Sequence, residues 1–296
     1  MNFDIGEVLT RSWQITWKYK VLWMYGFVVL LISFMFLPLM FAPMLADIFM
    51  EPSMDETVLV LLFSGGIVLF LLTTYTASAL LNAALTLGIL RAERGEEKLS
   101  FMELIRESYP FFWRYLGTMT LFVGGMLFVT LLFGIVIIAI SVVTFGLGMF
   151  CMIPFSFLQY PLVLVWYALN EQSLTAVVAD NMNVMDAVKQ SWQLFKKNFW
   201  VYILIGLVFY FGVSMLSTAV MMPLMFPFFL LPFAFEAGEF GNAILITGGL
   251  CTVIFTPIFL VFQSGVMTLM KSGWVLTYLR LTKPQDNAPI LPESNA

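Results

Sequence analysis

The sequence contains no histidine, only two cysteines and few charged residues. Histidine is the commonest general base near neutral pH and the commonest metal ligand, so its absence argues against catalytic triads and most zinc sites. Cys151 and Cys251 lie 100 residues apart in apolar stretches. We expect both to be small buried hydrophobic side chains rather than a disulfide or a metal pair.

Charged residues make up 11% of the 296 residues, apolar residues make up 61%, and the mean hydropathy is +0.94. Soluble domains are about 45–50% apolar and about 25% charged, so this composition excludes a soluble globule. It equally excludes a disordered chain. A net charge of −4 argues against a nucleic-acid partner. The composition therefore predicts a polytopic membrane protein.

A helix needs about 20 apolar residues to cross a membrane. Five uncharged runs exceed this length: Val21–Ala46, Thr57–Leu90, Tyr115–Asn170, Asn198–Phe235 and Phe240–Met270. The third run has 56 residues, enough for two helices. We separate these helices at Thr144–Gly148, where two glycines interrupt the apolar pattern. The sequence thus predicts six membrane spans.

The fourth run contains Pro223, Pro227 and Pro232 in its second half. Because proline interrupts the helical hydrogen-bond ladder, we expect a helix from about Trp200 to Met222 and then a proline-rich outer segment. Re-entry of that segment into the membrane is the alternative. The six spans drawn in this way contain no ionisable residue, and we expect Lys271 to lie at the inner interface.

The distribution of charge predicts the orientation. All 14 lysines and arginines fall in alternate connections or at their helix ends. The opposite connections carry only acids: Asp47, Glu51, Asp55, Glu56, Glu236 and Glu239. By the positive-inside rule this is a multi-pass protein of the plasma (bacterial inner) membrane with both termini cytoplasmic. A cleaved signal peptide is the alternative at the N-terminus, but the first run is much longer than a typical signal core.

Three segments, residues 4–18, 100–114 and 183–197, align without gaps. Each begins with a residue that favours helix N-caps and has an acid three residues later, as in a capping box. A serine, an aromatic residue and a cation then follow at the same positions. The shared positions are Asp4, Ser100 and Asn183; Glu7, Glu103 and Asp186; Ser12, Ser108 and Ser191; Trp13, Tyr109 and Trp192; Lys18, Arg114 and Lys197.

Each segment is amphipathic at helical period, as expected of a helix that lies in the membrane interface. In the third, the polar residues are Asp186, Lys189, Gln190, Gln193, Lys196 and Lys197. We predict an all-α membrane protein with six transmembrane helices, arranged as three repeated hairpins that each follow an interfacial amphipathic helix. Residues 1–283 form a single integral membrane domain, with repeats at about 4–91, 100–171 and 183–283. Residues 284–296 form a polar C-terminal tail.

The Ser-Trp pairs at Ser12-Trp13 and Ser191-Trp192, within the segments 6–18 and 184–200, resemble the bacterial glycerophosphoryl diester phosphodiesterase membrane-domain family. The resemblance covers most of the chain and implies a six-span membrane part. In some relatives a TIM-barrel phosphodiesterase domain follows. Here we expect only the polar tail after the membrane part. No catalytic residue of the family has a matching position, so the resemblance implies no phosphodiesterase activity.

Two sets of polar residues are candidate sites. The first is a collar for anionic lipid headgroups on the inner face: Arg11, Lys18, Arg114, Lys196 and Lys197. The second is a polar lining for a central cavity: Asn82, Gln159 and Gln263. Both have plainer alternatives. The cations can simply anchor helices at the interface, and the amides can simply form hydrogen bonds between helices.

The leading hypothesis is a non-enzymatic integral membrane protein that interacts with lipids or supports a membrane complex. Membrane lipids are the expected partners, and a membrane-protein partner or a second copy of the chain is compatible with the sequence. The alternative is a transporter or channel for an uncharged or amphipathic solute. The one dense acid cluster, around Glu103 and Glu107, is interleaved with cations. We expect it to form a solvated, salt-bridged loop, and we predict no catalytic residue, cofactor or metal.

Overall fold

The computed structural model describes residues 3–35, 56–146, 148–236 and 239–282, and within these ranges all regular structure is helical. The short helices that begin the three aligned segments are α1 (Ile5–Lys18), α5 (Phe101–Ser108) and α8 (Val184–Lys197). The other helices are α2 (Trp23–Phe34), α4 (Glu56–Glu93), α6 (Phe112–Val143), α7 (Gly148–Ala179), α9 (Phe199–Leu207), α10 (Val213–Glu236) and α11 (Glu239–Thr282). Short 3-10 turns η1 (Lys20–Leu22) and η2 (Tyr109–Phe111) precede α2 and α6, and a π-helical turn, η3 (Val208–Gly212), joins α9 to α10.

Several of these helices are long and apolar enough to cross a membrane. Within the described residues there are five such helices, or six if α1 and the following stretch Lys20–Phe34, which meet at 84°, count as one bent span. The prediction of a multi-pass, all-helical membrane protein is therefore confirmed at this level. The predicted outer acids Asp47, Glu51 and Asp55 lie outside the described residues.

The longest uncharged run is divided where the glycines predict. Helix α6 ends at Val143, and α7 begins at Gly148. Phe145 and Gly146 in the turn have φ values of +50° and +88°, a left-handed region that glycine enters without steric cost. The amide of Gly146 donates to the carbonyl of Ser141 at 2.8 Å and closes the helix end. The prediction of two helices in this run is confirmed.

The predicted end of the next helix at Met222 is wrong. Helix α10 continues to Glu236 and passes through Pro223, Pro227 and Pro232. Proline removes one backbone donor but leaves the rest of the ladder intact, and membrane helices tolerate it when neighbouring groups satisfy the freed carbonyls. The uncharged sequence around these prolines therefore extends the helix.

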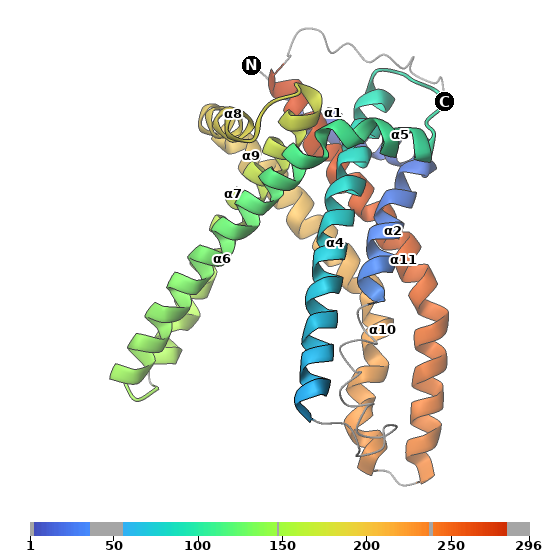
Figure 1. Cartoon of the computed structure of the whole chain (residues 1–296), viewed down its shortest axis with the longest axis vertical. Helices are drawn as coiled ribbons and strands as arrows, with labels where there is room; N and C mark the ends of the chain where they lie inside the picture. The colour runs from blue at the N-terminus through green and yellow to red at the C-terminus, as the bar shows by residue number, and fades with distance from the viewer. Residues whose placement is uncertain (1–2, 36–55, 147, 237–238, 283–296) are drawn as a thin grey trace.

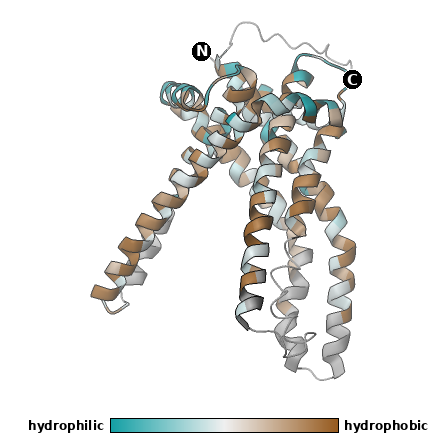
Figure 2. Cartoon of the chain, in the orientation of Figure 1, coloured by the Kyte–Doolittle hydropathy of each residue, from teal (hydrophilic) through white to brown (hydrophobic). Residues whose placement is uncertain are grey.

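The molecule has a charged end, which we define as the end where α1, α5 and α8 lie and where α4, α7 and α11 finish (Figure 1). Hydrophilic residues gather there, whereas the long helices that extend from it are largely hydrophobic (Figure 2). Away from this end, α6 and α7 run together and diverge from α2, α4, α10 and α11 (Figure 1). The elements are therefore joined most closely at the charged end.

Helices α4, α7 and α11 contact one another and form the centre of the molecule. Each short helix packs mainly on one of them: α1 on α11, α5 on α4 and α8 on α7. The first helix of the chain therefore rests on the last, and segments far apart in sequence complete the charged end. Helix α2 also lies against α11, while α6 packs against both α4 and α7.

The serine shared by the three aligned segments marks the packing face of each short helix. Ser12, Ser108 and Ser191 are fully buried, and each hydroxyl donates to a carbonyl three or four residues earlier in its own helix. A small side chain that satisfies its own hydroxyl lets helix backbones approach closely. The aromatic residues that follow these serines are about half exposed or more: Trp13, Tyr109 and Trp192.

The predicted N-caps are correct in position, since α1, α5 and α8 each begin one residue after Asp4, Ser100 and Asn183. The Asp4 carboxylate accepts the amide of Glu7 at 3.2 Å. The side chains of Ser100 and Asn183 make no such capping bond. The sequence pattern therefore locates all three helix starts, but the capping interaction forms in one.

The contact between the α9–α10 connection and α11 gives a test of this packing. A Cβ atom at Gly273 would collide with the buried ring of Phe209 in η3, whereas a Cβ at Gly249, on the same helix, would meet nothing within 4 Å. Overpacking of this kind costs about 1–3 kcal/mol. We expect Gly273→Ala to lower the melting temperature of the detergent-solubilised protein clearly. Gly249→Ala is the matched control and should melt at or slightly above the wild-type temperature, and equal melting of the two variants would contradict this packing.

Candidate functional site

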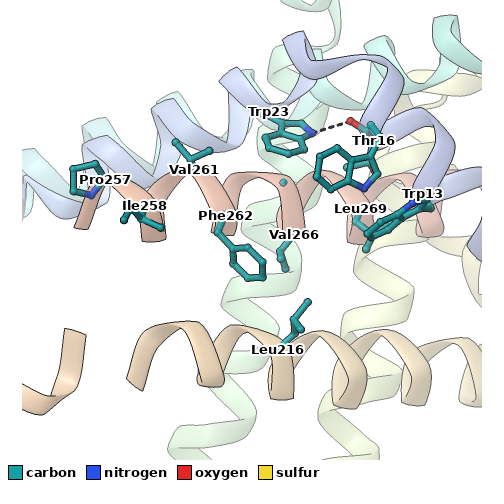
Figure 3. Close-up of a pocket in the computed structure, with 12 residues that line it drawn as sticks. Trp13, Thr16, Trp23, Leu216, Pro257, Ile258, Val261, Phe262, Val266 and Leu269 are labelled. Atoms are coloured by element: carbon teal, nitrogen blue, oxygen red, sulfur yellow. Dashed lines mark hydrogen bonds between the residues drawn. The ribbon is translucent and has the colours of Figure 1, made fainter. Parts of the chain in front are cut away.

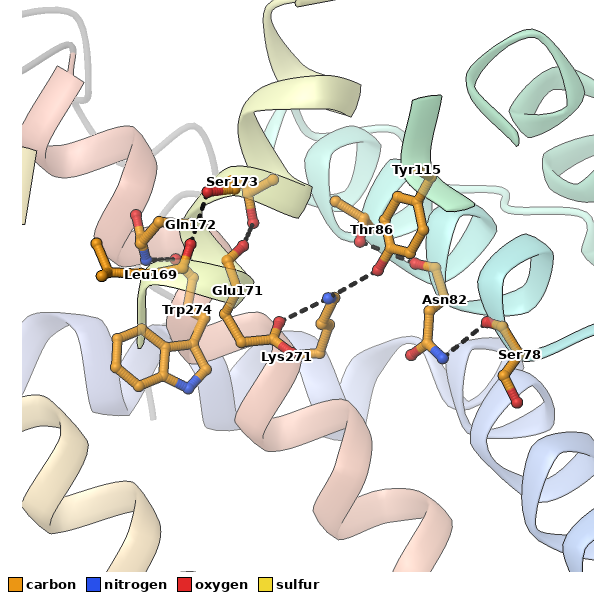
Figure 4. Close-up of polar contacts among 11 residues, drawn as sticks. Ser78, Asn82, Thr86, Tyr115, Leu169, Glu171, Gln172, Ser173, Lys271 and Trp274 are labelled. Carbon is orange, nitrogen blue, oxygen red and sulfur yellow. Dashed lines mark hydrogen bonds and ion pairs between the residues drawn. The ribbon is translucent and has the colours of Figure 1, made fainter. Parts of the chain in front are cut away.

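An ion pair is buried where the central helices meet at the charged end. The Lys271 ammonium of α11 donates to the Glu171 carboxylate of α7 at 2.6 Å and to the Tyr115 hydroxyl of α6 at 3.0 Å. Lys271 is 6% exposed, Glu171 is 8% exposed and Tyr115 is 1% exposed. We call these three residues the polar junction (Figure 4). The predicted spans end at Asn170 and Met270, so both partners lie just outside them, and span counting did not show that they are buried together.

Helix α4 adds further polar groups beside the polar junction. Asn82 and Thr86 lie on the Tyr115 side of the ion pair (Figure 4). The Asn82 amide donates to the carbonyl of Ser78 at 2.8 Å, and the Thr86 hydroxyl donates to the carbonyl of Asn82 at 2.8 Å. These groups are satisfied within α4, so they line the junction without adding an unpaired donor. Four helices thus meet around a single buried charge pair.

A second buried network attaches α1 to the centre. The Glu93 carboxylate at the end of α4 accepts from Arg11 of α1 at 2.8 Å and from Arg280 of α11 at 3.0 Å. Arg280 also pairs with Glu7 of α1 at 2.9 Å. The Glu93 carboxylate therefore links three helices that lie far apart in sequence: α1, α4 and α11.

The structure divides the predicted collar. Arg11 is 6% exposed and is held by Glu93, so it is not available to a lipid headgroup. Arg114 donates to the carbonyl of Asn181 at 2.8 Å and stays partly exposed. The remaining collar cations are exposed: Lys18, Lys196 and Lys197. The pattern could not distinguish a buried arginine from surface cations on the same kind of helix.

The three predicted cavity amides have different surroundings. Gln159 is exposed on α7, Asn82 is bonded within α4, and Gln263 has a buried Oε1 atom without a partner. A different amide occupies the buried position on α7. Gln172 donates to the carbonyl of Trp274 at 3.1 Å and accepts the Tyr202 hydroxyl at 3.3 Å. Gln172 follows Glu171, the first charged residue after the uncharged run Tyr115–Asn170. It therefore lay outside the spans predicted from uncharged length.

Three further predictions concern the acid cluster, metal binding and the cysteines. Arg91 pairs with Glu96, Glu103 and Glu107, as expected of a salt-bridged loop. Glu93 of the same acid cluster is instead buried and pairs with Arg11 and Arg280. Across the residues that the structure describes, no group of three or more histidine, cysteine or acidic residues could hold a metal. Cys251 is a free thiol that is only partly buried, whereas we expected full burial.

A groove of about 590 Å³ opens between α1, α2, α10 and α11. The tryptophan groove, as we name it, is lined by Trp13, Trp17, Trp23, Leu216, Val261 and Phe262, together with further apolar residues of α11. Figure 3 shows Trp13 and Trp23 beside α11 and Leu216 on the opposite side, on α10. Thr16 is the only hydroxyl-bearing side chain in its described lining. This surface suits a hydrocarbon chain and offers almost nothing to a polar ligand.

Aromatic contacts hold the tryptophan wall in place. The Trp23 indole donates to the carbonyl of Thr16 at 2.8 Å, which ties the start of α2 to the end of α1. The ring of Trp17 lies 5.4 Å from that of Trp13 and 5.3 Å from that of Trp23, measured between centroids. Such tilted and edge-on pairs are favourable for aromatic rings. The groove is therefore a built surface whose shape depends on the 84° turn between α1 and α2.

Comparison of the chain with family models, curated proteins and solved structures finds no match. Function is therefore inferred from the geometry of the polar junction and the tryptophan groove.

A double-mutant cycle tests the role of the polar junction. Replacing one member of a buried ion pair leaves the other charge uncompensated and typically costs about 3–5 kcal/mol, whereas replacing both can be nearly neutral. We expect Lys271→Met and Glu171→Gln each to lower the thermal stability in detergent strongly. The double variant should recover much of that loss. Additive losses in the double variant would contradict a direct pair.

Proposed function

We propose that this chain is a non-enzymatic integral membrane protein that binds membrane lipid, with a hydrocarbon chain of the lipid in the tryptophan groove. The observation that carries the proposal is the groove itself, which is open to the outside, almost wholly apolar and walled by three tryptophans. Trp13 is 54% exposed and Trp17 is 47% exposed, so the groove can be reached from outside the protein. Tryptophan favours the interfacial level of a bilayer, where the ring contacts both chains and headgroups.

We also propose that the chain consists of three hairpin repeats, each preceded by an interfacial amphipathic helix. Three observations support this: the order short helix, long helix, long helix holds for the second and third segments, each short helix packs on one central helix, and each shared serine is buried. In the first segment, α1 is followed by α2, which is described over Trp23–Phe34, and by the long helix α4. The resemblance to the glycerophosphoryl diester phosphodiesterase membrane domain fits the same arrangement and remains a prediction.

We also propose that the charged end faces the cytoplasm, because the positive-inside rule assigns lysine-rich and arginine-rich connections to that side. A green fluorescent protein fused after Ala296 should fluoresce, and alkaline phosphatase at the same position should be inactive. The control is a fusion within the loop between Val143 and Gly148, which should give the opposite pair of signals. Active phosphatase at the C-terminus would contradict the orientation.

Filling the tryptophan groove with a larger side chain tests whether it binds lipid. Val261 lines the groove on α11 and is 48% exposed, whereas Val253, two turns earlier on the same helix, is 71% exposed and does not line the groove. We expect Val261→Trp to occupy part of the volume and to reduce the number of lipids that remain bound when the protein is released from detergent in native mass spectrometry.

Val253→Trp is the matched control, since it adds the same side chain to the same helix outside the groove. It should retain the wild-type number of lipids. If both variants and the wild type carry the same bound lipid, or if the wild type carries none, the groove is not a lipid site.

A transporter or channel is the second candidate function, and the polar junction favours it. Ionisable residues inside membrane helices often mark a substrate or ion path. Lys271, Glu171 and Tyr115 are mutually satisfied, however, and they lie near one end of their helices. We therefore assign the junction to holding the helices together and the lipid contact to the tryptophan groove.

A further inference from the structure

The part of the α6–α7 hairpin that lies away from the charged end is largely exposed. The two helices pack on each other and diverge from the remaining long helices (Figure 1). A complete turn of α7, Gln159–Leu162, is exposed, and so are Leu127, Leu131 and Ile135 on α6. Exposed apolar side chains on such a hairpin suit a lipid environment. An exposed polar side chain in the same place requires another explanation.

Gln159 is such a polar side chain. Its carboxamide has two donor hydrogens and an acceptor oxygen, and within the part of the chain that the structure describes it forms no hydrogen bond. Around α7 it lies about 120–180° from Leu164, Ala168 and Glu171, the buried residues with which this helix packs towards the centre. The Gln159 amide therefore lies on the side of α7 opposite its packing face.

The position of Gln159 along α7 places the amide deep in the membrane. Gln159 follows Gly148 by 11 residues and precedes Glu171 by 12 residues. At about 1.5 Å per residue, it lies about 16 Å from the hairpin turn and about 18 Å from the polar junction. The hydrocarbon core of a bilayer is about 30 Å thick, so the amide lies near its middle. Because no water reaches that depth, the amide is costly unless a protein group pairs with it.

A second unpaired polar group lies at a similar depth on α6. The Thr130 hydroxyl is exposed and makes no hydrogen bond among the described residues. Thr118 and Thr120 on the same helix differ, since each hydroxyl donates to a carbonyl four residues earlier. Thr130 lies 13 residues before Val143, which is about 20 Å from the end of α6. Both helices of the hairpin therefore carry an unsatisfied polar group in the same band of depth.

We infer that a second copy of this chain covers the exposed turn of α7, with the Gln159 amides of the two copies hydrogen-bonded to each other. Two copies inserted in the same direction are related by a two-fold axis along the membrane normal, which brings equal depths together. A carboxamide is complementary to itself, so each Nε2 donates to the Oε1 of the other copy. Membrane helices associate through hydrogen bonds of this kind.

Symmetry favours a second copy over a different membrane protein. A different protein needs its own amide or hydroxyl at the depth of Gln159, whereas a second copy supplies the matching amide without any further condition. The hydroxyl of Thr130 lies on the adjacent helix at the depth of this contact. The structure therefore supplies both partners of the interaction from one sequence.

This inference goes beyond the proposed function and does not depend on it. The described lining of the tryptophan groove comes from α1, α2, α10 and α11, and it includes no residue of α6 or α7. A dimer formed through α7 therefore leaves the groove open. Lipid retention and self-association can be measured separately, and either can fail while the other stands.

The first test measures self-association in liposomes of phosphatidylcholine. The full chain carries a donor or an acceptor fluorophore on a peptide tag after Ala296. Energy transfer is followed as the protein is diluted with lipid, and we expect a two-copy equilibrium for the wild type. Gln159→Leu keeps the size of the side chain and removes its hydrogen-bonding groups. It should raise the dissociation constant about tenfold, the effect expected for the loss of two interhelical hydrogen bonds.

Thr73→Val on α4 is the matched control. Thr73 is exposed and lies 20 residues before the end of its helix at the charged end, as Gln159 does. Its hydroxyl already donates to the carbonyl of Leu69 at 2.8 Å, so it needs no partner from another chain. The variant should self-associate as the wild type does. Melting temperatures in detergent check that both variants are folded.

Cysteine cross-linking locates the contact. The background chain carries Cys151→Ser and Cys251→Ser. Leu162→Cys then places a thiol on the exposed turn, and Leu72→Cys places one on α4, where the native leucines are 60% and 58% exposed. Oxidation should link two copies through Leu162→Cys and not through Leu72→Cys, and adding Gln159→Leu should weaken the link.

Three results would overturn the inference. The first is a wild-type chain that stays monomeric at every dilution. The second is a Gln159→Leu variant that associates as tightly as the wild type, which would show that the amide is not part of the contact. The third is equal cross-linking from Leu162→Cys and Leu72→Cys, which would indicate random collision in the membrane.

Discussion

The buried pair of Lys271 and Glu171 is the interaction on which the rest of the structure depends. It joins α11 to α7, and the Tyr115 hydroxyl adds α6 to the same point. Packing in lipid gains little from the hydrophobic effect, because lipid chains are as apolar as the side chains they replace. Polar contacts and small residues must therefore hold the helices together, and here both gather at the charged end. Farther along, the Tyr75 hydroxyl of α4 donates to the Thr120 hydroxyl of α6 at 3.1 Å, and beyond that contact α6 and α7 diverge from the other long helices (Figure 1).

The same principle explains how the short helices are fixed. Each presents a fully buried serine to a central helix and leaves an aromatic side chain exposed beside it. Helix α1 receives the additional network of Arg11, Glu93 and Arg280, which connects both ends of the described chain. Because α1 is held at this angle, its tryptophans form a wall against α10 and α11. The tryptophan groove is thus a consequence of the ion pairs that dock α1, although none of their charges enters it.

The sequence predicted much of the fold from elementary rules. Uncharged length identified the spanning helices, the glycines at 144–148 identified a hairpin turn, and the aligned segments identified three helix starts. It misjudged features that depend on neighbours. Pro223 did not end a helix, and Arg11 was not a surface cation. The pairing of Lys271 with Glu171, 100 residues earlier, was not predicted, because a sequence cannot show that their charged atoms lie 2.6 Å apart.

Hydropathy and the spacing of charges are properties of single segments, so the sequence by itself determined the class of protein, the positions of most helices and the basic character of one end. Which cations are buried, which amides remain unpaired and where hollows form depend on several segments at once. The tertiary structure alone decided that α1 rests on α11 and that Gln172 rather than Gln159 is buried. The physical reason is that desolvation and pairing energies belong to contacts between helices, which no single helical pattern contains.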